Sequence, residues 1–154
     1  METLDSNTSL LKQRLRPLFS TMRVLLVDDM ATNLDQYRLI LADLGFERAN
    51  VDTAVNGLIG LSKLVKEVPD LIIADWNMPL MDGYQFVKNI RQHKHLDALI
   101  LTMVTAEHEK DLQEVAPYIN AFERKPATTA DLEKMIITAV AKKVADPHHP
   151  LGQP

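Results

Sequence analysis

The sequence contains no cysteine, and this absence excludes both a disulfide framework and a thiolate metal site. It also lacks any apolar run near the ~20 residues that a membrane-spanning helix needs, since stretches such as residues 99–104 are far shorter. Basic residues are not in excess, and the formal net charge is −4. Nucleic acid and anionic membranes favour basic surfaces, so neither is an expected partner. Glu2 and Asp5 stand where a secretion signal carries positive charge, which predicts a cytoplasmic protein.

Five short segments have the pattern of β-strands. Three are apolar runs of the kind found in strands that are buried on both faces of a parallel sheet. Two weaker candidates fall between helical patterns at the expected interval. The predicted strands cover residues 23–28, 51–54, 71–75, 99–104 and 120–124.

Apolar residues recur at three- and four-residue steps between and after these strands, which predicts five helices. Gly45 marks the end of the first helix, Asn56 is a candidate N-cap of the second, and Thr128 with Asp131 gives a capping-box pattern before the last. The predicted helices cover residues 34–44, 58–68, 84–90, 107–116 and 132–140.

Strands that alternate with helices of this length predict a doubly wound α/β fold with a parallel sheet. The domain is expected over residues 21–144. Residues 1–20 form an N-terminal extension whose apolar stripe fits a short helix, and residues 145–154, rich in Pro and His, are expected to be a disordered tail.

Polar side chains follow the ends of several predicted strands. Because the carboxyl ends of parallel strands meet at one edge of the sheet, we expect these side chains to lie together. They are Asp28, Asp29, Asp75, Thr105 and Lys125. Converging carboxylates repel one another unless a cation neutralises them, and Mg²⁺ is suited to carboxylate and phosphate oxygens.

With that ion present, a carboxylate can accept a phosphoryl group, as in aspartyl-phosphate enzymes. Lys125 offers a positive charge and Thr105 a hydroxyl donor for the phosphoryl oxygens. Each residue also has a simpler interpretation. The acidic pair fits a solvated loop, Thr105 a helix cap, and Lys125 a turn before Pro126. The conjunction of all five positions favours the chemical interpretation.

The motifs in which these residues stand resemble those of response-regulator receiver domains, and closely those of single-domain chemotaxis regulators. The resemblance extends from about residue 22 to residue 144. Its motifs are Val27-Asp28-Asp29, Asp75-Trp76-Asn77-Met78-Pro79 with Asp82-Gly83, Val104-Thr105-Ala106-Glu107 and Lys125-Pro126.

The resemblance implies a flavodoxin-like (βα)5 fold with strand order 2-1-3-4-5. It implies that Asp75 is the phosphoacceptor, and that Asp28, Asp29, Asp75 and the backbone carbonyl of Asn77 bind Mg²⁺, Asp28 largely through water. It further implies a switch in which Thr105 moves toward the phosphoryl group and Phe122 turns inward, although Phe122 also fits a plain edge-strand hydrophobe. The phosphoryl group would come from a histidine kinase or phosphotransfer protein, and the output would be contact with a downstream protein.

The sequence departs from the chemotaxis pattern on the expected output face. Thr105 and Lys125 are two residues closer together, Pro117 interrupts the fourth helix, and Ala127 stands where Phe is usual. We therefore expect a shortened fourth helix. The sequence does not tell whether the flagellar motor is a partner. The chain is expected to be a monomer or a weak dimer.

Two other classes of function are alternatives to a phosphorylated switch. One is a phosphorylation-independent, receiver-type adaptor, which the complete set of five site residues disfavours. The other is a true Mg²⁺-dependent phosphohydrolase of the haloacid dehalogenase type. That class uses a second acid two residues after its nucleophile, where Asn77 stands here. We predict a switch rather than an enzyme, with only self-phosphorylation and slow self-dephosphorylation.

Overall fold

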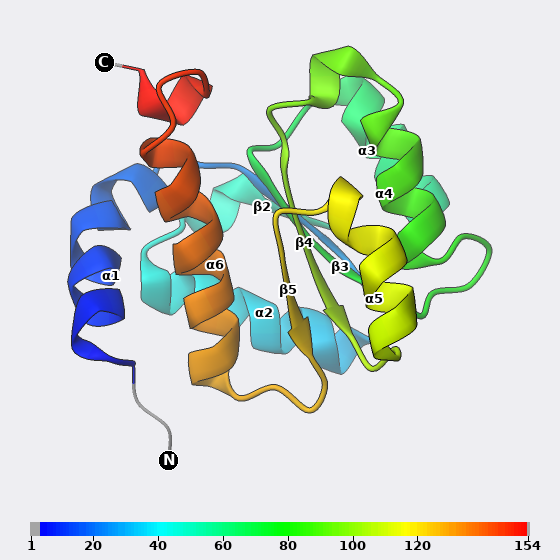
Figure 1. The fold of residues 1–154 in the computed structure, drawn as a ribbon, viewed down its shortest axis with the longest axis horizontal. Helices are drawn as coiled ribbons and strands as arrows, with labels where there is room; N and C mark the ends of the chain where they lie inside the picture. The colour runs from blue at the N-terminus through cyan, green and yellow to red at the C-terminus, as the bar shows by residue number, and fades with distance from the viewer. Residues whose placement is uncertain (1–3, 154) are drawn as a thin grey trace.

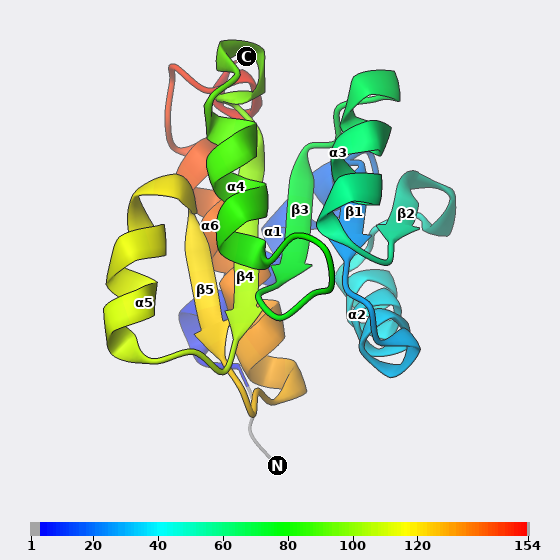
Figure 2. The ribbon, with the colours of Figure 1, turned by 90° about the vertical axis from the view of Figure 1, so that its right-hand side faces the viewer.

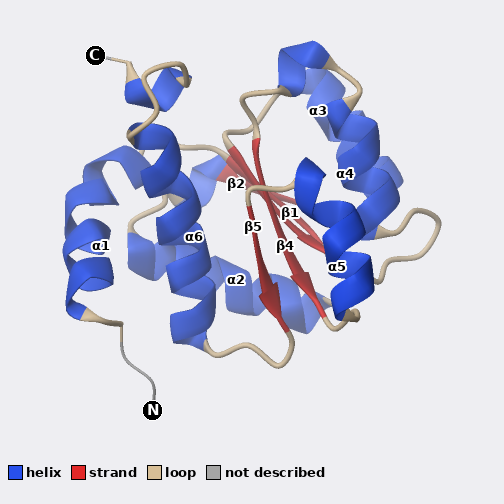
Figure 3. Ribbon diagram, in the orientation of Figure 1, coloured by secondary structure: helices blue, strands red, loops and turns tan. Residues whose placement is uncertain are grey.

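A computed structural model describes residues 4–153 of the chain. It contains one five-stranded parallel sheet between layers of helices (Figure 1, Figure 3). The strands are β1 (Val24–Val27), β2 (Val51–Ala54), β3 (Leu71–Asp75), β4 (Ile100–Thr105) and β5 (Ala121–Arg124). Their order, β2-β1-β3-β4-β5, is the order that the family resemblance implied. The doubly wound α/β prediction is therefore confirmed.

The helices begin and end close to the predicted positions. They are α1 (Ser6–Phe19), α2 (Ala31–Leu44), α3 (Gly57–Lys66), α4 (Gly83–Arg91), α5 (Glu109–Val115) and α6 (Thr129–Val144), with the 3-10 turns η1 (Arg48–Asn50), η2 (Lys94–Leu96), η3 (Ala116–Tyr118) and η4 (Pro150–Gly152). The residues predicted to end or cap helices do so in the structure. Gly45 ends α2 with a φ of 113°, the Asn56 side chain accepts the N–H of Ile59, and Thr128 forms a capping box with Asp131. The fourth helix of the predicted set, α5, is only seven residues long and runs into the turn that contains Pro117.

Two hydrophobic clusters lie on opposite faces of the sheet. One gathers side chains of α1, α2 and α6 against β1, β3 and β4, and the other those of α3, α4 and α5. In Figure 2 the helices α3, α4 and α5 lie on the face toward the viewer, and α6 lies behind the sheet. Both faces of the central strands are thus covered, which explains why β1, β3 and β4 are buried throughout.

The N-terminal segment forms a helix that packs on the outside of α2 and α6 (Figure 1). Phe19 is fully buried and stacks on Phe46 with ring centroids 4.6 Å apart. Lys12 Nζ contacts Asp43 Oδ2 at 2.8 Å and Glu133 Oε2 at 3.3 Å. The boundary expected at residue 21 therefore does not separate two packing units. Residues 1–3 of the extension, including Glu2, lie outside the described residues.

The C-terminal segment differs from the disordered tail expected from its composition. His149 is 8% exposed, and its Nε2 lies 2.7 Å from the carbonyl oxygen of Ala98. Its Nδ1 accepts the backbone N–H of Leu151 at 3.1 Å. These hydrogen bonds hold the segment that contains His149 beside the start of β4. Pro154 is not among the described residues.

Candidate functional site

Three carboxylates meet at the carboxyl edge of the sheet. Asp28 and Asp29 follow β1, and Asp75 ends the neighbouring strand β3, whose Ala74 is paired with Val27. One oxygen from each carboxylate lies within 4.8 Å of the others. Asp28 and Asp75 are buried, whereas Asp29 is exposed to solvent. The predicted convergence of these three residues is therefore present in the structure.

Lys125 is the cation of this cluster. Its Nζ contacts Asp75 Oδ1 at 2.6 Å, and its backbone N–H donates to the carbonyl oxygen of Thr105 at 2.8 Å. The second bond continues the pairing of β4 with β5 beyond Arg124, so the sheet itself directs the lysine toward Asp75. The peptide bond between Lys125 and Pro126 is cis.

Thr105 and Phe122 take different positions relative to the carboxylates. Thr105 is fully buried at the end of β4, and its Oγ1 accepts the N–H of Glu107 at 2.9 Å. Phe122 lies on β5, paired with Met103, and its side chain is 41% exposed. Asn77 is exposed in the loop that follows β3.

The β3–α4 loop returns closely over the end of β3. Gly83 donates its N–H to the carbonyl oxygen of Trp76 at 2.7 Å. A Cβ at Gly83 would lie 2.7 Å from the carbonyl oxygen of Asp75 and 2.8 Å from the Cα of Trp76. Only glycine therefore permits this approach, and Asp82 caps α4 by accepting the N–H of Gln85.

Burial makes ionisation of the two inner carboxylates costly. It is the largest cause that raises the pKa of Asp28, and the charge of Asp75 raises it further, while the N–H of Met30 and the amide of Asn33 oppose the rise. Burial likewise raises the pKa of Asp75 against the opposing effect of Lys125. A bound cation would relieve both groups, so the electrostatics favour a metal site.

Two neighbours of the site were not predicted from the sequence. Asn33 Nδ2 donates to Asp28 Oδ2 at 3.0 Å from the first turn of α2. Tyr37, one turn further along the helix, is 4% exposed. Burial and the charges of Asp28 and Asp75 raise the pKa of its phenol. The four-residue spacing of Asn33 and Tyr37 places both on one side of α2, but such spacing is common in helices and gives no specific signal.

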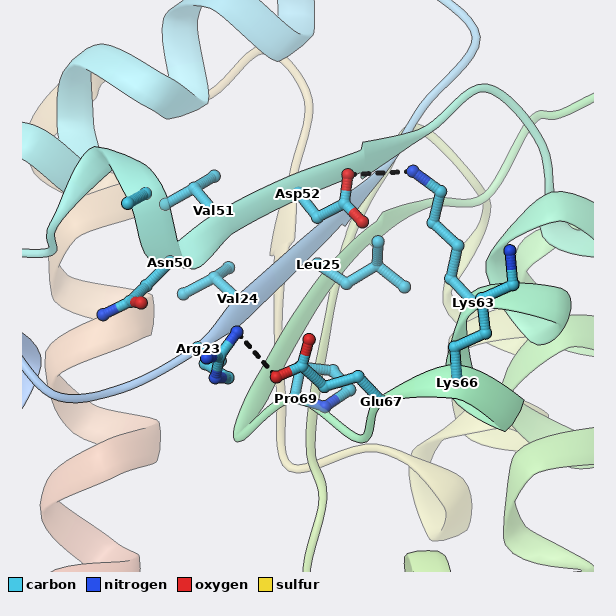
Figure 4. A pocket seen from close by; sticks show the side chains of 11 residues that line it. Arg23, Val24, Leu25, Asn50, Val51, Asp52, Lys63, Lys66, Glu67 and Pro69 are labelled. Carbon is cyan, nitrogen blue, oxygen red and sulfur yellow. Dashed lines mark hydrogen bonds and ion pairs between the residues drawn. The ribbon is translucent and has the colours of Figure 1, made fainter.

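A separate hollow of about 500 Å³ lies at the opposite ends of β1 and β2 (Figure 4). It contains cations, but Lys63 Nζ contacts Asp52 Oδ1 at 2.8 Å and Arg23 Nη1 contacts Glu67 Oε1 at 2.6 Å. Two of the three cations that line the hollow are thus paired with carboxylates within it, and the third is Lys66. The hollow therefore does not match the acidic cluster as a candidate site.

The acidic cluster lies in a part of the chain that matches a known protein family. The family model of the response regulator receiver domain matches residues 24–137. The chain belongs to the response regulator receiver family. Receivers of this kind are signalling proteins of two-component phosphorelays, and as a class they interact with histidine kinases and downstream targets.

Curated relatives of this receiver include chemotaxis proteins. It is 36% identical over 121 residues to chemotaxis protein CheY-3 of Vibrio cholerae, covering 77% of this chain and 92% of the relative. It is 33% identical over 117 residues to chemotaxis protein CheY of Pseudomonas aeruginosa, covering 75% and 93%. These matches confirm the family resemblance inferred from the motifs.

Solved structures agree with this placement. Chemotaxis response regulator CheY4 of Vibrio cholerae matches with a TM-score of 0.68 and 32% identity, covering 77% of this chain and 99% of that one. The receiver domain of a sensor histidine kinase from Pseudomonas aeruginosa, solved with a magnesium ion coordinated in its active site cleft, shares the fold with a TM-score of 0.67 and 22% identity, covering 78% and 98%. Within residues 4–153 of the present receiver, no helix is both long and apolar enough to cross a membrane.

Proposed function

We propose that this receiver accepts a phosphoryl group on Asp75 with Mg²⁺ bound by Asp28, Asp29, Asp75 and the backbone carbonyl of Asn77. The observation that carries the proposal is the meeting of three carboxylates within 4.8 Å, with Lys125 Nζ 2.6 Å from Asp75. This arrangement supports phosphoacceptor chemistry because it combines a buried nucleophile, a cation site and a fixed positive charge.

The donor set suits Mg²⁺. All the proposed ligand atoms are oxygens, and the exposed Asp29 leaves one side of the cluster open to water and to phosphate oxygens. With the carboxylates ionised, three negative charges and one ammonium leave a net charge that a divalent ion neutralises. When bound, the ion offsets the negative charge that collects on the phosphoryl oxygens.

The side chains of the receiver then have distinct tasks. A carboxylate oxygen of Asp75 attacks the phosphorus of a phosphohistidine donor, the P–O bond forms, and the P–N bond breaks with its electron pair left on the donor imidazole. Lys125 stabilises the transferred group by its charge, and the hydroxyl of Thr105 donates to a phosphoryl oxygen. Water then attacks the phosphorus, the P–O bond to Asp75 breaks, and inorganic phosphate leaves with the carboxylate regenerated. The only turnover expected is therefore self-phosphorylation and slow self-dephosphorylation.

The same proposal gives Thr105 and Phe122 a signalling role. Thr105 Oγ1 is bonded to the N–H of Glu107, and Phe122 is 41% exposed, which fits the unphosphorylated form. A shift of Thr105 toward the phosphoryl group would open space beside β5 and favour an inward rotamer of Phe122. The output would be a changed surface around Phe122 and the short helix α5, recognised by a downstream protein. The donor is a histidine kinase or phosphotransfer protein, and the receiver acts as a monomer or a weak dimer.

Intact mass after incubation with Mg²⁺ and acetyl phosphate tests the proposal. We expect a single labile adduct of one phosphoryl group, absent in Asp75→Asn and in a sample treated with a chelator. The matched control is Asp70→Asn, at an aspartate whose Oδ2 accepts the N–H of Arg23 at the other end of β3. This variant should label as the unmodified chain does. An adduct that persists in Asp75→Asn would refute the assignment of the phosphoacceptor.

A further inference from the structure

Asn33 holds the buried carboxylate of Asp28 from one side. The residue is half-buried in the first turn of α2, and its Nδ2 donates to Asp28 Oδ2 at 3.0 Å. The other oxygen, Oδ1, accepts the backbone N–H of Met30 at 2.9 Å. A backbone donor and a side-chain donor thus fix Asp28 at two points, and together they set the plane of its carboxylate.

The chemical nature of the donor matters for a cation site. Asp28 is fully buried, and an oxygen without a hydrogen-bond donor would rotate toward any other partner or favour the protonated group. An amide supplies a donor without adding positive charge, so it orients the carboxylate and leaves its charge available to a metal ion. Lysine or arginine at this position would instead compete with the ion. Donors of this kind commonly tune metal ligands.

We propose that Asn33 is a positioning residue for Mg²⁺, acting through Asp28. The inference rests on the proposed function, since it concerns the same site. It extends that function by assigning part of the ion's affinity to a residue outside the ligand set. Asn33 touches neither the phosphoryl group nor the ion in this scheme.

The test is a Mg²⁺ titration of the full chain, read in two ways. Trp76 is the only tryptophan and directly follows Asp75, so its fluorescence is a local probe, and isothermal titration calorimetry gives an independent Kd. The variant Asn33→Leu keeps the side-chain size and removes the donor. We expect its Kd for Mg²⁺ to rise on the order of 10-fold, within the range usual for loss of a partner of a metal ligand. Asn33→Gln retains the amide and should recover most of the affinity. Thr32→Ala, on the exposed neighbouring residue, is the matched control and should bind as the unmodified chain does.

A double-mutant cycle separates positioning from a general structural effect. In the Asp28→Asn background, Asn33→Leu should change the Kd by less than about 2-fold, because the residue through which it acts is already altered. An unchanged Kd for Asn33→Leu alone, or an equal loss in both backgrounds, would overturn the inference while leaving the proposed function intact. If the unmodified chain shows no saturable response to Mg²⁺, the proposed function and this inference both fail.

Discussion

At the scale of single residues, the burial of Asp28 lowers the stability of the metal-free protein. It is fully buried beside Asp75, and burial raises its pKa in the folded chain above the ordinary value. The raised pKa therefore opposes folding wherever the unfolded carboxyl is ionised and no cation is bound. This cost falls as the pH drops below the folded pKa and vanishes below the unfolded pKa, where both states are protonated. Asp28 thus destabilises the metal-free protein at the position where the proposed cation would bind.

The first prediction concerns the substitution Asp28→Asn. Without Mg²⁺ at pH 7, the variant should have a higher midpoint of thermal unfolding than the unmodified chain, and the difference should shrink as the pH is lowered toward 4. Differential scanning calorimetry across this pH range, in buffer with chelator, measures it. Asp35→Asn is the control, since that side chain is 72% exposed on helix α2, which follows the loop that contains Asp28. A difference that grows on acidification would show that the sign of the argument is wrong.

Gly83 carries the second prediction at the residue scale. Gly83→Ala would place a Cβ against the backbone of Asp75 and Trp76, which cannot move as a side chain does. We expect a loss of ~1–3 kcal/mol in the free energy of unfolding, together with weaker phosphorylation. Gly57→Ala is the matched control, because its Cβ would meet only the side chain of Met81 at 3.0–3.2 Å. Urea unfolding of the two variants should separate them clearly.

Helix α1 precedes the part of the chain that the family model matches, which begins at residue 24. Its inner face nevertheless belongs to the core around α2 and α6, through Leu15 and Phe19. The helix therefore covers apolar surface of α2 and α6 that the minimal domain would expose to solvent.

A substitution in α1 tests this role. Phe19→Ala should cost ~3–5 kcal/mol in unfolding free energy, as expected for truncating a fully buried aromatic residue. Leu10→Ala on the same helix, where the side chain is 45% exposed, should stay within about 0.5 kcal/mol of the unmodified chain. Denaturant titration measures both. Equal small effects would mean that α1 adds little to the core.

Some features of these elements could be predicted from the sequence and others could not. Gly45, Asn56 and Thr128 gave correct helix boundaries because capping is local to a few residues. The contact between His149 and Ala98, 51 residues earlier, was not predicted, because composition carries no information about contacts between distant parts of the chain. In the site, the meeting of the carboxylates followed from strand alternation. The bond from Asn33 depends on a rotamer that no pattern specifies.

At the scale of the whole molecule, the proposed ion is a stabilising ligand. If Mg²⁺ binds only the folded chain, a concentration 100 times its Kd adds roughly 2.7 kcal/mol to the free energy of unfolding. For a domain of this size, that corresponds to a rise of about 5–10 °C in Tm. Thermal scans with and without Mg²⁺ measure the shift.

Chelation should reverse this shift. Asp29→Asn, at the exposed member of the acidic cluster, should greatly reduce it while leaving the metal-free Tm nearly unchanged. A shift of the same size in that variant would place the bound ion elsewhere on the molecule.

The parallel sheet gives the molecule two distinct ends. Asp5 contacts Lys134 at 3.5 Å near the start of α6, on the side where the strands finish, whereas His149 is fastened beside the start of β4. In Figure 1 the start of helix α1 and the turn η4 accordingly lie at opposite ends of the molecule. A sensor chip or affinity resin attached through the C-terminal segment would hold the carboxylates facing the solution, ready for an incoming kinase. Attachment through the N-terminal segment would turn that reactive pole toward the support.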